Sequence, residues 1–302
     1  MASTKAFFLW VGSPLPPLAQ ISIDSAVANS FDVVLFSDRK NEFVSNKVRQ
    51  ADFREISLPF TPSDINIVNS SKPSYAHFAD LFRYKLLSQE DGWWFDTDTL
   101  VLADCEQFSE LLPPNGLSLA YEDESVVGNS VIGSSSNSSM ENIYRAALEY
   151  FPRISRWGVS GPQLITKLCR DGTLDSVRLL SSSAFFPVHY EDADHFFRES
   201  EFESVSMSCK DSLCVSLWNK VLHQKGLLDF HPSEKTYIGR YLANNFKSDF
   251  HFGNNDRVVD AVCESAQDGV KVASGTEATR LAFNKLLDKT NKLRKRVIHR
   301  EF

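Results

Sequence analysis

The stretch that organises this chain reads DLFRYKLLSQEDGWWFDTD and covers residues 80–98. Apolar residues around its beginning recur at the spacing of a helix with one buried face, which predicts a helix over 75–89. A turn at Gly92 follows, and the aromatic run after it predicts a short buried strand. This strand ends in two aspartates separated by one residue, Asp96 and Asp98.

The carboxylate pair has two interpretations. Aspartate after a strand commonly bonds to nearby backbone in a turn. Two carboxylates at a strand end are also suitable ligands for a hard cation that bridges phosphate oxygens. Side-chain alternation puts Trp94 on the face that carries Asp96 and Asp98, so Trp94 is expected to border a site there.

The helix before the pair carries Asp80 and Arg83, which are neighbours at i, i+3. One interpretation is a surface ion pair, which contributes little to stability. The other is a contribution to the site, and we favour it because the helix runs directly into the Asp-x-Asp strand.

The segments upstream predict an α/β sheet. Strands alternate with helices there, an order that indicates parallel strands. Ligands in such sheets bind beyond the carboxyl ends of the strands, and Trp10 lies close to such an end. The expected elements are strands at 5–12, 32–37 and 53–58, a helix that ends near Ser30 and a helix over 39–49.

Downstream of the pair, the pattern predicts further strands and helices around one unusual polar residue. Asn129 falls inside an expected strand, 126–132. The other expected strands are 100–102, 117–121, 177–180 and 184–188, and the expected helices are 140–150 and 162–169.

Composition narrows the class of protein. The 302 residues are 42% hydrophobic and 24% charged, as in ordinary globular proteins, and the net charge of −7 disfavours nucleic acid as a partner. Five cysteines without a Cys-x-x-Cys pair argue for reduced thiols in the cytosol and against a zinc knuckle or a disulfide framework. No apolar run approaches the ~20 residues that span a bilayer.

The end of the chain is expected to be a helical and irregular elaboration, residues 226–302, of a domain formed by residues 1–225. Lysines and arginines recur with apolar residues over 277–300, which predicts a basic amphipathic helix. Such a helix on an acidic protein suggests contact with an anionic membrane leaflet or partner. A solvated terminal helix is the alternative.

Several short motifs follow one another along residues 5–220. In order they are Trp10-Val11-Gly12, Asp80-x-x-Arg83-Tyr84, Gly92-x-x-x-Asp96-x-Asp98, Asn129, Gly161-Pro162 and Ser216-x-Trp218. This order resembles the Asp-x-Asp sugar-transfer family. The family includes capsule and O-antigen glycosyltransferases, α-1,4-glycosyltransferases and yeast initiating mannosyltransferases, and more distantly the glucosylating domain of clostridial toxins.

The resemblance implies a GT-A fold, a Rossmann-like mixed sheet flanked by helices, for residues 1–225. It also implies a retaining hexosyltransferase that uses Mn²⁺ or Mg²⁺ and a UDP-sugar, either UDP-galactose, UDP-glucose or UDP-GlcNAc. The implied acceptor is a glycan or glycolipid, as in bacterial surface polysaccharide synthesis. The implied location is the cytoplasm or the inner face of the membrane.

The family's functional residues carry over by position. Trp10 resembles the aromatic residue on which uracil stacks, Asp80 and Arg83 the pair that holds sugar hydroxyls, and Asp98 the direct metal ligand. The catalytic residues implied are Asp80, Arg83, Asp96, Asp98 and Asn129. The donor-binding residues implied are Trp10, Val11, Tyr75, Asp80, Arg83, Trp94, Asp96 and Trp218, and the metal ligands implied are Asp96, Asp98 and Ser216.

The chain departs from the family pattern at three positions. Many members have a histidine as metal ligand at the position of Ser216 in this chain. The toxin relatives have a serine there, as this chain does. The departure affects the expected affinity for the metal. Asp91 replaces a turn glycine and Ala79 replaces a serine. Two alternatives stay open at this point: a metal-dependent nucleotidyltransferase, and an inactive sugar-binding or scaffold protein on the same fold.

Overall fold

The computed structural model describes residues 4–12, 15–42, 44–70, 72–228 and 232–245, with Val259 and Cys263. These residues form two compact units. The first contains residues 1–193 and 203–218, and the second contains residues 194–202 and 219–302. All of the predicted site residues belong to the first unit.

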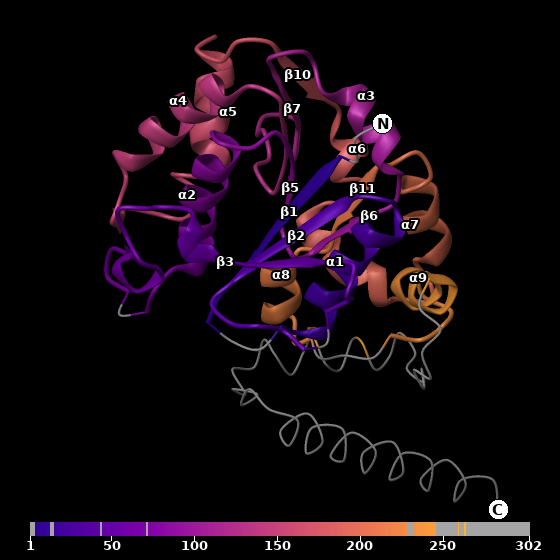
Figure 1. Cartoon of the computed structure of the whole chain (residues 1–302). Coiled ribbons are helices and arrows are strands. Elements are labelled where there is room, and N and C mark those ends of the chain that lie inside the picture. The colour runs from indigo at the N-terminus through magenta and orange to yellow at the C-terminus, as the bar shows by residue number, and fades with distance from the viewer. Residues whose placement is uncertain are drawn as a thin grey trace, which may run out of the picture. The chain divides into compact units, whose positions relative to one another are not determined.

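A seven-stranded mixed sheet runs through the first unit, in the order β10-β7-β8-β5-β1-β2-β3 (Figure 1). Only β8 of this sheet is antiparallel to its neighbours, β7 and β5; the other neighbouring strands are parallel. The strands are β1 (Lys5–Trp10), β2 (Asp32–Ser37), β3 (Arg49–Asp52), β5 (Gly92–Phe95), β7 (Leu117–Ala120), β8 (Val131–Ser134) and β10 (Val177–Leu180).

Two short ribbons accompany the main sheet. In one, β6 (Thr99–Val101) pairs antiparallel with β11 (Cys214–Ser216). In the other, β4 (Asn66–Ile67) pairs parallel with β9 (Arg153–Ile154). Both ribbons connect segments that are far apart in the sequence, so they place distant loops next to the main sheet.

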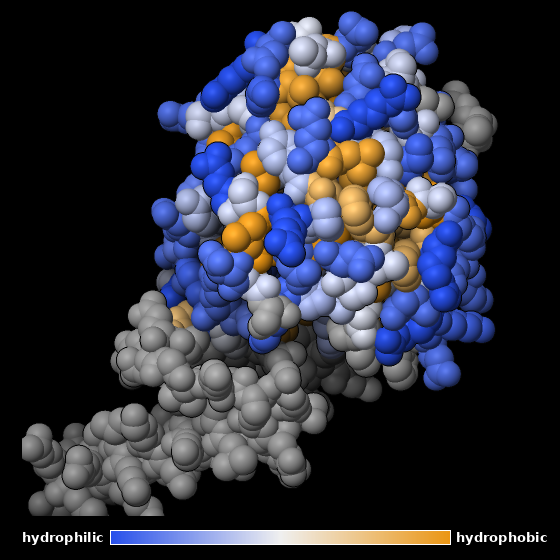
Figure 2. All heavy atoms as spheres, turned by 90° about the vertical axis from the view of Figure 1, so that its left-hand side faces the viewer, coloured by the Kyte–Doolittle hydropathy of each residue, from blue (hydrophilic) through white to orange (hydrophobic). Residues whose placement is uncertain are grey.

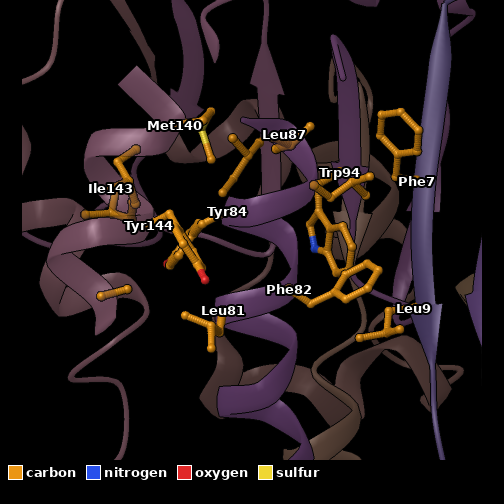
Figure 3. Close-up of a cluster of buried hydrophobic side chains, with 14 of the residues drawn as sticks. Phe7, Leu9, Leu81, Phe82, Tyr84, Leu87, Trp94, Met140, Ile143 and Tyr144 are labelled. Carbon is orange, nitrogen blue, oxygen red and sulfur yellow. The ribbon is translucent and has the colours of Figure 1, made fainter. Parts of the chain in front are cut away.

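Helices cover both faces of the sheet, and each face has its own hydrophobic cluster. On one face α2 (Tyr75–Leu87), α4 (Asn137–Leu148) and α5 (Pro162–Arg170) bury residues such as Phe82 and Met140 against the strands (Figure 3). On the other face α1 (Pro17–Ala28), α3 (Cys105–Leu111) and α6 (Ser182–Phe185) do the same. The strand β5 serves both faces, with Trp94 in the first cluster and Trp93 in the second.

The remaining described helices are short. They are α7 (Phe202–Ser208), α8 (Asn219–Gln224), α9 (Tyr237–Asn245) and the 3-10 helices η1 (Phe53–Glu55), η2 (Pro62–Asp64) and η3 (Tyr190–Phe197). In the second unit the buried Asp194 accepts hydrogen bonds from Arg198 Nε, at 2.6 Å, and from Lys225. This ion-pair cluster joins residues 194–202 to α8, although they are separated in the sequence.

The predicted α/β fold, a mixed sheet flanked by helices, is confirmed over the described residues. Some local predictions are wrong. The described residues between β2 and β3 form turns instead of the predicted helix over 39–49, and residues 53–58 begin with η1 instead of forming a strand, since β3 ends at Asp52. Residues 184–188 include the end of α6 instead of a strand, and Asn129 precedes β8 instead of lying inside a strand. In each case the tertiary contacts of a short segment outweigh its local sequence pattern.

The ordinary composition of the chain predicts a mainly polar surface, and one face of the molecule shows it (Figure 2). Figure 2, which views the face where α2, α4 and α5 lie, shows mainly hydrophilic residues with hydrophobic residues in small groups. In the part of the chain that the structure describes, no helix is both long and apolar enough to cross a bilayer. The predicted basic helix over 277–300 lies outside the described residues.

Candidate functional site

The predicted site residues gather where β1 and β5 end. Trp10 is the last residue of β1, and Asp96 follows β5 directly. Because β8 is antiparallel to β5, its amino end lies at the same edge, and Asn129 comes just before it. The Asp96 N–H donates to the Ser130 carbonyl at 2.8 Å, which joins the two segments. The mixed sheet therefore brings three separate motifs together.

Arg83 lies in the interior and connects two aspartates. Its side chain is 3% exposed, its Nη2 lies 2.9 Å from Asp96 Oδ1, and the same nitrogen lies 3.5 Å from Asp80 Oδ1. Burial acts to lower the pKa of Arg83, but the charges of Asp96 and Asp80 outweigh it and raise that pKa. The surface-pair interpretation of Asp80 and Arg83 is therefore wrong, since both side chains are buried.

A polar network holds Asp80. Asn129 Nδ2 donates to Asp80 Oδ1 at 2.8 Å, and Ser160 Oγ donates to Asp80 Oδ2 at 3.0 Å. Asn129 Nδ2 also lies 3.0 Å from the Tyr84 hydroxyl, and the Asn129 carbonyl accepts from Arg83. Asp80, Arg83 and Asn129 therefore form one continuous network.

Three members of this network were not predicted as site residues: Tyr84, Ser160 and Gly161. The Tyr84 hydroxyl donates to the Ser160 carbonyl at 3.1 Å. A Cβ atom at Gly161 would lie 2.9 Å from Asn129 Nδ2 and 3.0 Å from Asp80 Oδ2, so the site has no space for a side chain there. The Gly161-Pro162 motif and the tyrosine after Arg83 were the available signals.

Trp94 contacts both Asp96 and Arg83. Its indole Nε1 donates to Asp96 Oδ1 at 2.9 Å, and the Arg83 guanidinium carbon lies 5.0 Å from the centre of its ring. The predicted proximity to Asp96 is confirmed. The predicted contact with the nucleotide does not fit this structure, because the Trp94 side chain is packed in the first hydrophobic cluster and only 1% exposed.

Asp96 has an unusual environment. Burial raises its pKa to about 7, the positive charge of Arg83 opposes this shift, and the negative charge of Asp98 adds to it. The side chain is 30% exposed, so it lies in a recess that the protein surrounds and solvent still reaches. A cation placed between two neighbouring carboxylates stabilises the charged form of both.

The predicted metal ligands come from the β6–β11 ribbon and the turn before it. Ser216 pairs with Thr99, and the Leu217 N–H donates to the Asp98 carbonyl at 2.7 Å, so Ser216 lies beside the Asp-x-Asp turn. Carboxylate and hydroxyl oxygens suit Mg²⁺ or Mn²⁺. Among the described residues no group of three His, Cys, Asp or Glu side chains could hold a metal. The aspartate pair would thus need Ser216, water or phosphate oxygens to complete the coordination.

Trp218 follows the ribbon in a strained conformation. Its φ is +59°, which is uncommon for a bulky residue and is often found at functional sites. Its indole Nε1 donates to the Val188 carbonyl at 2.9 Å, and its ring stacks on Phe186. A contact of the Trp218 indole N–H with the donor would therefore require Trp218 to give up its hydrogen bond with Val188.

The predicted nucleotide-binding residues lie near the end of β1. A Cβ atom at Gly12 would lie 3.1 Å from the Tyr75 ring, so Tyr75 packs against the turn after β1. Tyr75 is 49% exposed, and Trp10 and Val11 are partly buried. A cavity of about 450 Å³ lies elsewhere, near Lys5 and Gly92 at the opposite ends of β1 and β5, and no predicted site residue lines it.

A family model matches a region of the chain that contains the later residues of the site. Residues 139–245, less than half of the chain, match the alpha 1,4-glycosyltransferase conserved region. This region of the chain is similar to that glycosyltransferase family. The matched glycosyltransferase region contains Ser160, Gly161, Ser216 and Trp218, whereas the Asp-x-Asp stretch precedes it. No curated protein matches the chain.

Solved structures with a similar arrangement have low sequence identity. The PaToxG glycosyltransferase is 15% identical, with a TM-score of 0.43, over 82% of this chain and 87% of that one. GlyE of Streptococcus pneumoniae TIGR4 is 14% identical, with a TM-score of 0.47, over 91% and 66%. The galactosyltransferase LgtC, solved with donor and acceptor sugar analogues, is 12% identical, with a TM-score of 0.41, over 70% and 86%. Similarity at this level says nothing about donor, metal or stereochemistry.

Proposed function

We propose that this glycosyltransferase moves a hexose from a UDP-sugar to a glycan or glycolipid acceptor with retention of the anomeric configuration. The observation that carries the proposal is the buried network of Asp80, Arg83, Asp96 and Asn129 beside the Asp98–Ser216 segment. Hydrogen-bonding groups that can hold a sugar thus lie next to oxygen ligands that can hold a metal diphosphate.

In this proposal each residue has its own task. Asp80 accepts hydrogen bonds from sugar hydroxyls, and Asn129 and Ser160 keep its carboxylate in position. Arg83 holds Asp96 and supplies positive charge near the diphosphate. Trp10, Val11 and Tyr75 form the side on which the uracil binds. Fixed groups of this kind stabilise charge that develops as the anomeric bond breaks.

Asp98, Asp96 and Ser216 are the residues that would hold Mn²⁺ or Mg²⁺. A bound divalent cation neutralises negative charge on the departing diphosphate. Burial is the main cause of the raised pKa of Asp96, and the negative charge of Asp98 adds to it. A cation would offset this repulsion between the two carboxylates, which supports the assignment. The proposal also assigns residues 226–302 to an elaboration of the catalytic domain, with a membrane contact through the predicted basic helix. Deletion of 285–302 should then weaken liposome binding.

The test is UDP release from UDP-galactose, UDP-glucose and UDP-GlcNAc in the presence of Mn²⁺. We expect one of these donors to be hydrolysed slowly without an acceptor, and we expect EDTA or Asp98→Ala to abolish the release. Asp175→Ala is the matched control, because Asp175 is exposed and precedes β10 away from the site. Full activity of Asp98→Ala in EDTA would contradict the proposal. Release of UMP instead of UDP would indicate a nucleotidyltransferase.

A further inference from the structure

The loop between β9 and α5 carries an exposed tryptophan on a hydrogen-bonded backbone. Trp157 is 47% exposed. Its carbonyl accepts from Gln163 Nε2 at 3.2 Å, and the Gly161 N–H donates to the Gly158 carbonyl at 3.2 Å. Gly158 has a φ of +76°, which favours glycine and fixes the turn after the tryptophan. The ring is therefore presented to solvent by a loop that its own hydrogen bonds hold together.

The same loop contributes directly to the sugar-binding network. Ser160, three residues after Trp157, donates to Asp80 Oδ2. The Trp157 ring also meets the His77 ring edge to face, with centroids 5.1 Å apart. His77 and Asp80 are i, i+3 neighbours on α2, about 5–6 Å apart. Trp157 thus lies about one helical turn from the carboxylate proposed to hold the donor sugar.

Asp80 and Trp157 differ in their exposure to solvent. Asp80 is 7% exposed and Trp157 is 47% exposed. A donor sugar at Asp80 would be enclosed, whereas a ligand on Trp157 would stay open to solvent on its far side. Val68, which is 49% exposed, adds apolar surface nearby, because its N–H donates to the Ile154 carbonyl at 2.8 Å. An open surface of this kind suits a larger molecule that binds through one of its rings.

Positive charge surrounds the platform. Arg153 and Arg156, just before Trp157, are exposed on a protein whose net charge is −7. Within the described part of the chain neither arginine takes part in a salt bridge. Lys72 is also exposed, and it is next to Pro73, which bridges to Asn66 opposite Arg153. Arg156 is adjacent to Trp157 in the chain and Arg153 precedes it by four residues, so an anionic ligand is favoured there.

We propose that Trp157, flanked by Arg153 and Arg156, is the binding platform for an acidic pyranose of the acceptor glycan. The apolar C–H face of the pyranose lies on the indole ring, and its carboxylate or phosphate meets the arginines. This inference rests on the proposed glycosyl transfer, because it uses the position of the platform beside the donor-sugar site.

The first test measures binding without catalysis. The full chain, labelled with 5-fluorotryptophan, gives a fluorine resonance for each of its five tryptophans, and Trp157→Phe identifies the resonance of Trp157. Methyl β-glucuronide is then titrated against methyl β-glucoside, and glucose 6-phosphate serves as the phosphate-bearing probe. We expect the acidic sugars to shift the Trp157 resonance and to bind several-fold more tightly than methyl β-glucoside.

Arg156→Gln tests the charge separately from the stacking. We expect this variant to lose the preference for acidic sugars while Trp157 still responds to all of them. A Trp157 resonance that none of the three sugars moves would overturn the proposal. Equal binding of neutral and acidic sugars would overturn its acidic part. A glucuronide response without a glucose 6-phosphate response would restrict the anion to a carboxylate.

The second test measures transfer to whichever sugar binds. Trp157→Ala should raise the KM for the acceptor about tenfold, as expected for the loss of one stacked ring, and change the KM for the UDP-sugar less. Met207→Ala is the control, since Met207 is 73% exposed on α7 outside the loop. An acceptor KM that stays unchanged would overturn the platform. Absence of UDP release from the unmodified chain would instead contradict the proposed function.

Discussion

The Arg83 guanidinium and the Asp96 carboxylate form an ion pair in the interior of the first unit, with Nη2 2.9 Å from Oδ1. The two residues come from α2 and from the end of β5, on opposite sides of a turn. Their pairing joins the helix to the Asp-x-Asp segment, and Trp94 contacts both partners. The buried charge of Arg83 is therefore a structural requirement of the site as well as a candidate ligand for the donor.

Replacing Arg83 with methionine should destabilise the protein strongly. The change leaves the buried Asp80 and the partly buried Asp96 without their cation, and breaking a buried pair in this way costs about 3–5 kcal/mol. The exposed pair of Arg145 and Glu141, 3.0 Å apart on α4, is the matched control and should cost about 0.3–0.5 kcal/mol when Arg145 is changed to methionine. Urea unfolding of both variants measures the difference. Equal losses would contradict a buried ion pair at Arg83.

Replacing Ser216 with alanine should weaken the binding of metal and leave the fold intact. The hydroxyl is an expected ligand, so the Mn²⁺ concentration that gives half of the maximal UDP release should rise about tenfold, ~1.4 kcal/mol. Thr99→Val is the control, because Thr99 is opposite Ser216 in the ribbon and its buried Oγ1 has no hydrogen-bond partner among the described residues.

The Thr99→Val control has an expected outcome of its own. Removing a buried hydroxyl that lacks a partner should stabilise the protein by about 1 kcal/mol, with the metal requirement unchanged. If Ser216→Ala and Thr99→Val altered the Mn²⁺ dependence equally, Ser216 would have no specific role toward the metal.

Replacing Gly161 with alanine should distort the network around Asp80. The added methyl group would lie 2.9 Å from Asn129 Nδ2 and 3.0 Å from Asp80 Oδ2, distances that require these side chains to move. We expect a loss of about 1–3 kcal/mol in stability and a fall in kcat for UDP release that exceeds any change in the Mn²⁺ requirement. Unchanged kcat would show that the position of Asp80 tolerates this movement.

Replacing Asp194 with asparagine should destabilise the second unit in a pH-dependent way. Burial acts to raise the pKa of Asp194, but the hydrogen bonds from Lys225 and Arg198 outweigh it and lower that pKa. A carboxyl group whose pKa is lowered by folding stabilises the protein above its unfolded pKa of about 3.9, and this contribution is lost as the pH falls through the folded pKa.

The free energy of unfolding should therefore fall by about 1–3 kcal/mol in Asp194→Asn at pH 7, and the difference from the unmodified chain should shrink below about pH 4. Asp175→Asn, at an exposed position, should show neither effect. A difference that stayed constant down to low pH would mean that the charge of Asp194 does not account for its stabilisation.

Regular patterns in the sequence predicted most of the fold. The helical spacing in 75–89 and the apolar run 32–37 correspond to α2 and β2, because each buries a continuous face whose period is written in its residues. The Asp-x-Asp pair was likewise visible after an aromatic strand. The turns between β2 and β3 were not predictable from the local pattern, since Val44 and Val48 are buried in the second hydrophobic cluster without forming a helix.

Tertiary structure decided what the site residues do. Asp80 and Arg83 look like a surface pair at the level of spacing, and only burial by α5 and its preceding loop shows that they belong to a network with Asn129 and Ser160. Trp94 looked like a ligand-facing ring and is instead packed beneath Asp96. The sequence alone determined which chemical groups are present and which segments form helices and strands, because those depend on local periodicity. Which groups meet depended on the antiparallel β8 and on the β6–β11 ribbon, because only strand pairing brings residues so distant in sequence within bonding distance.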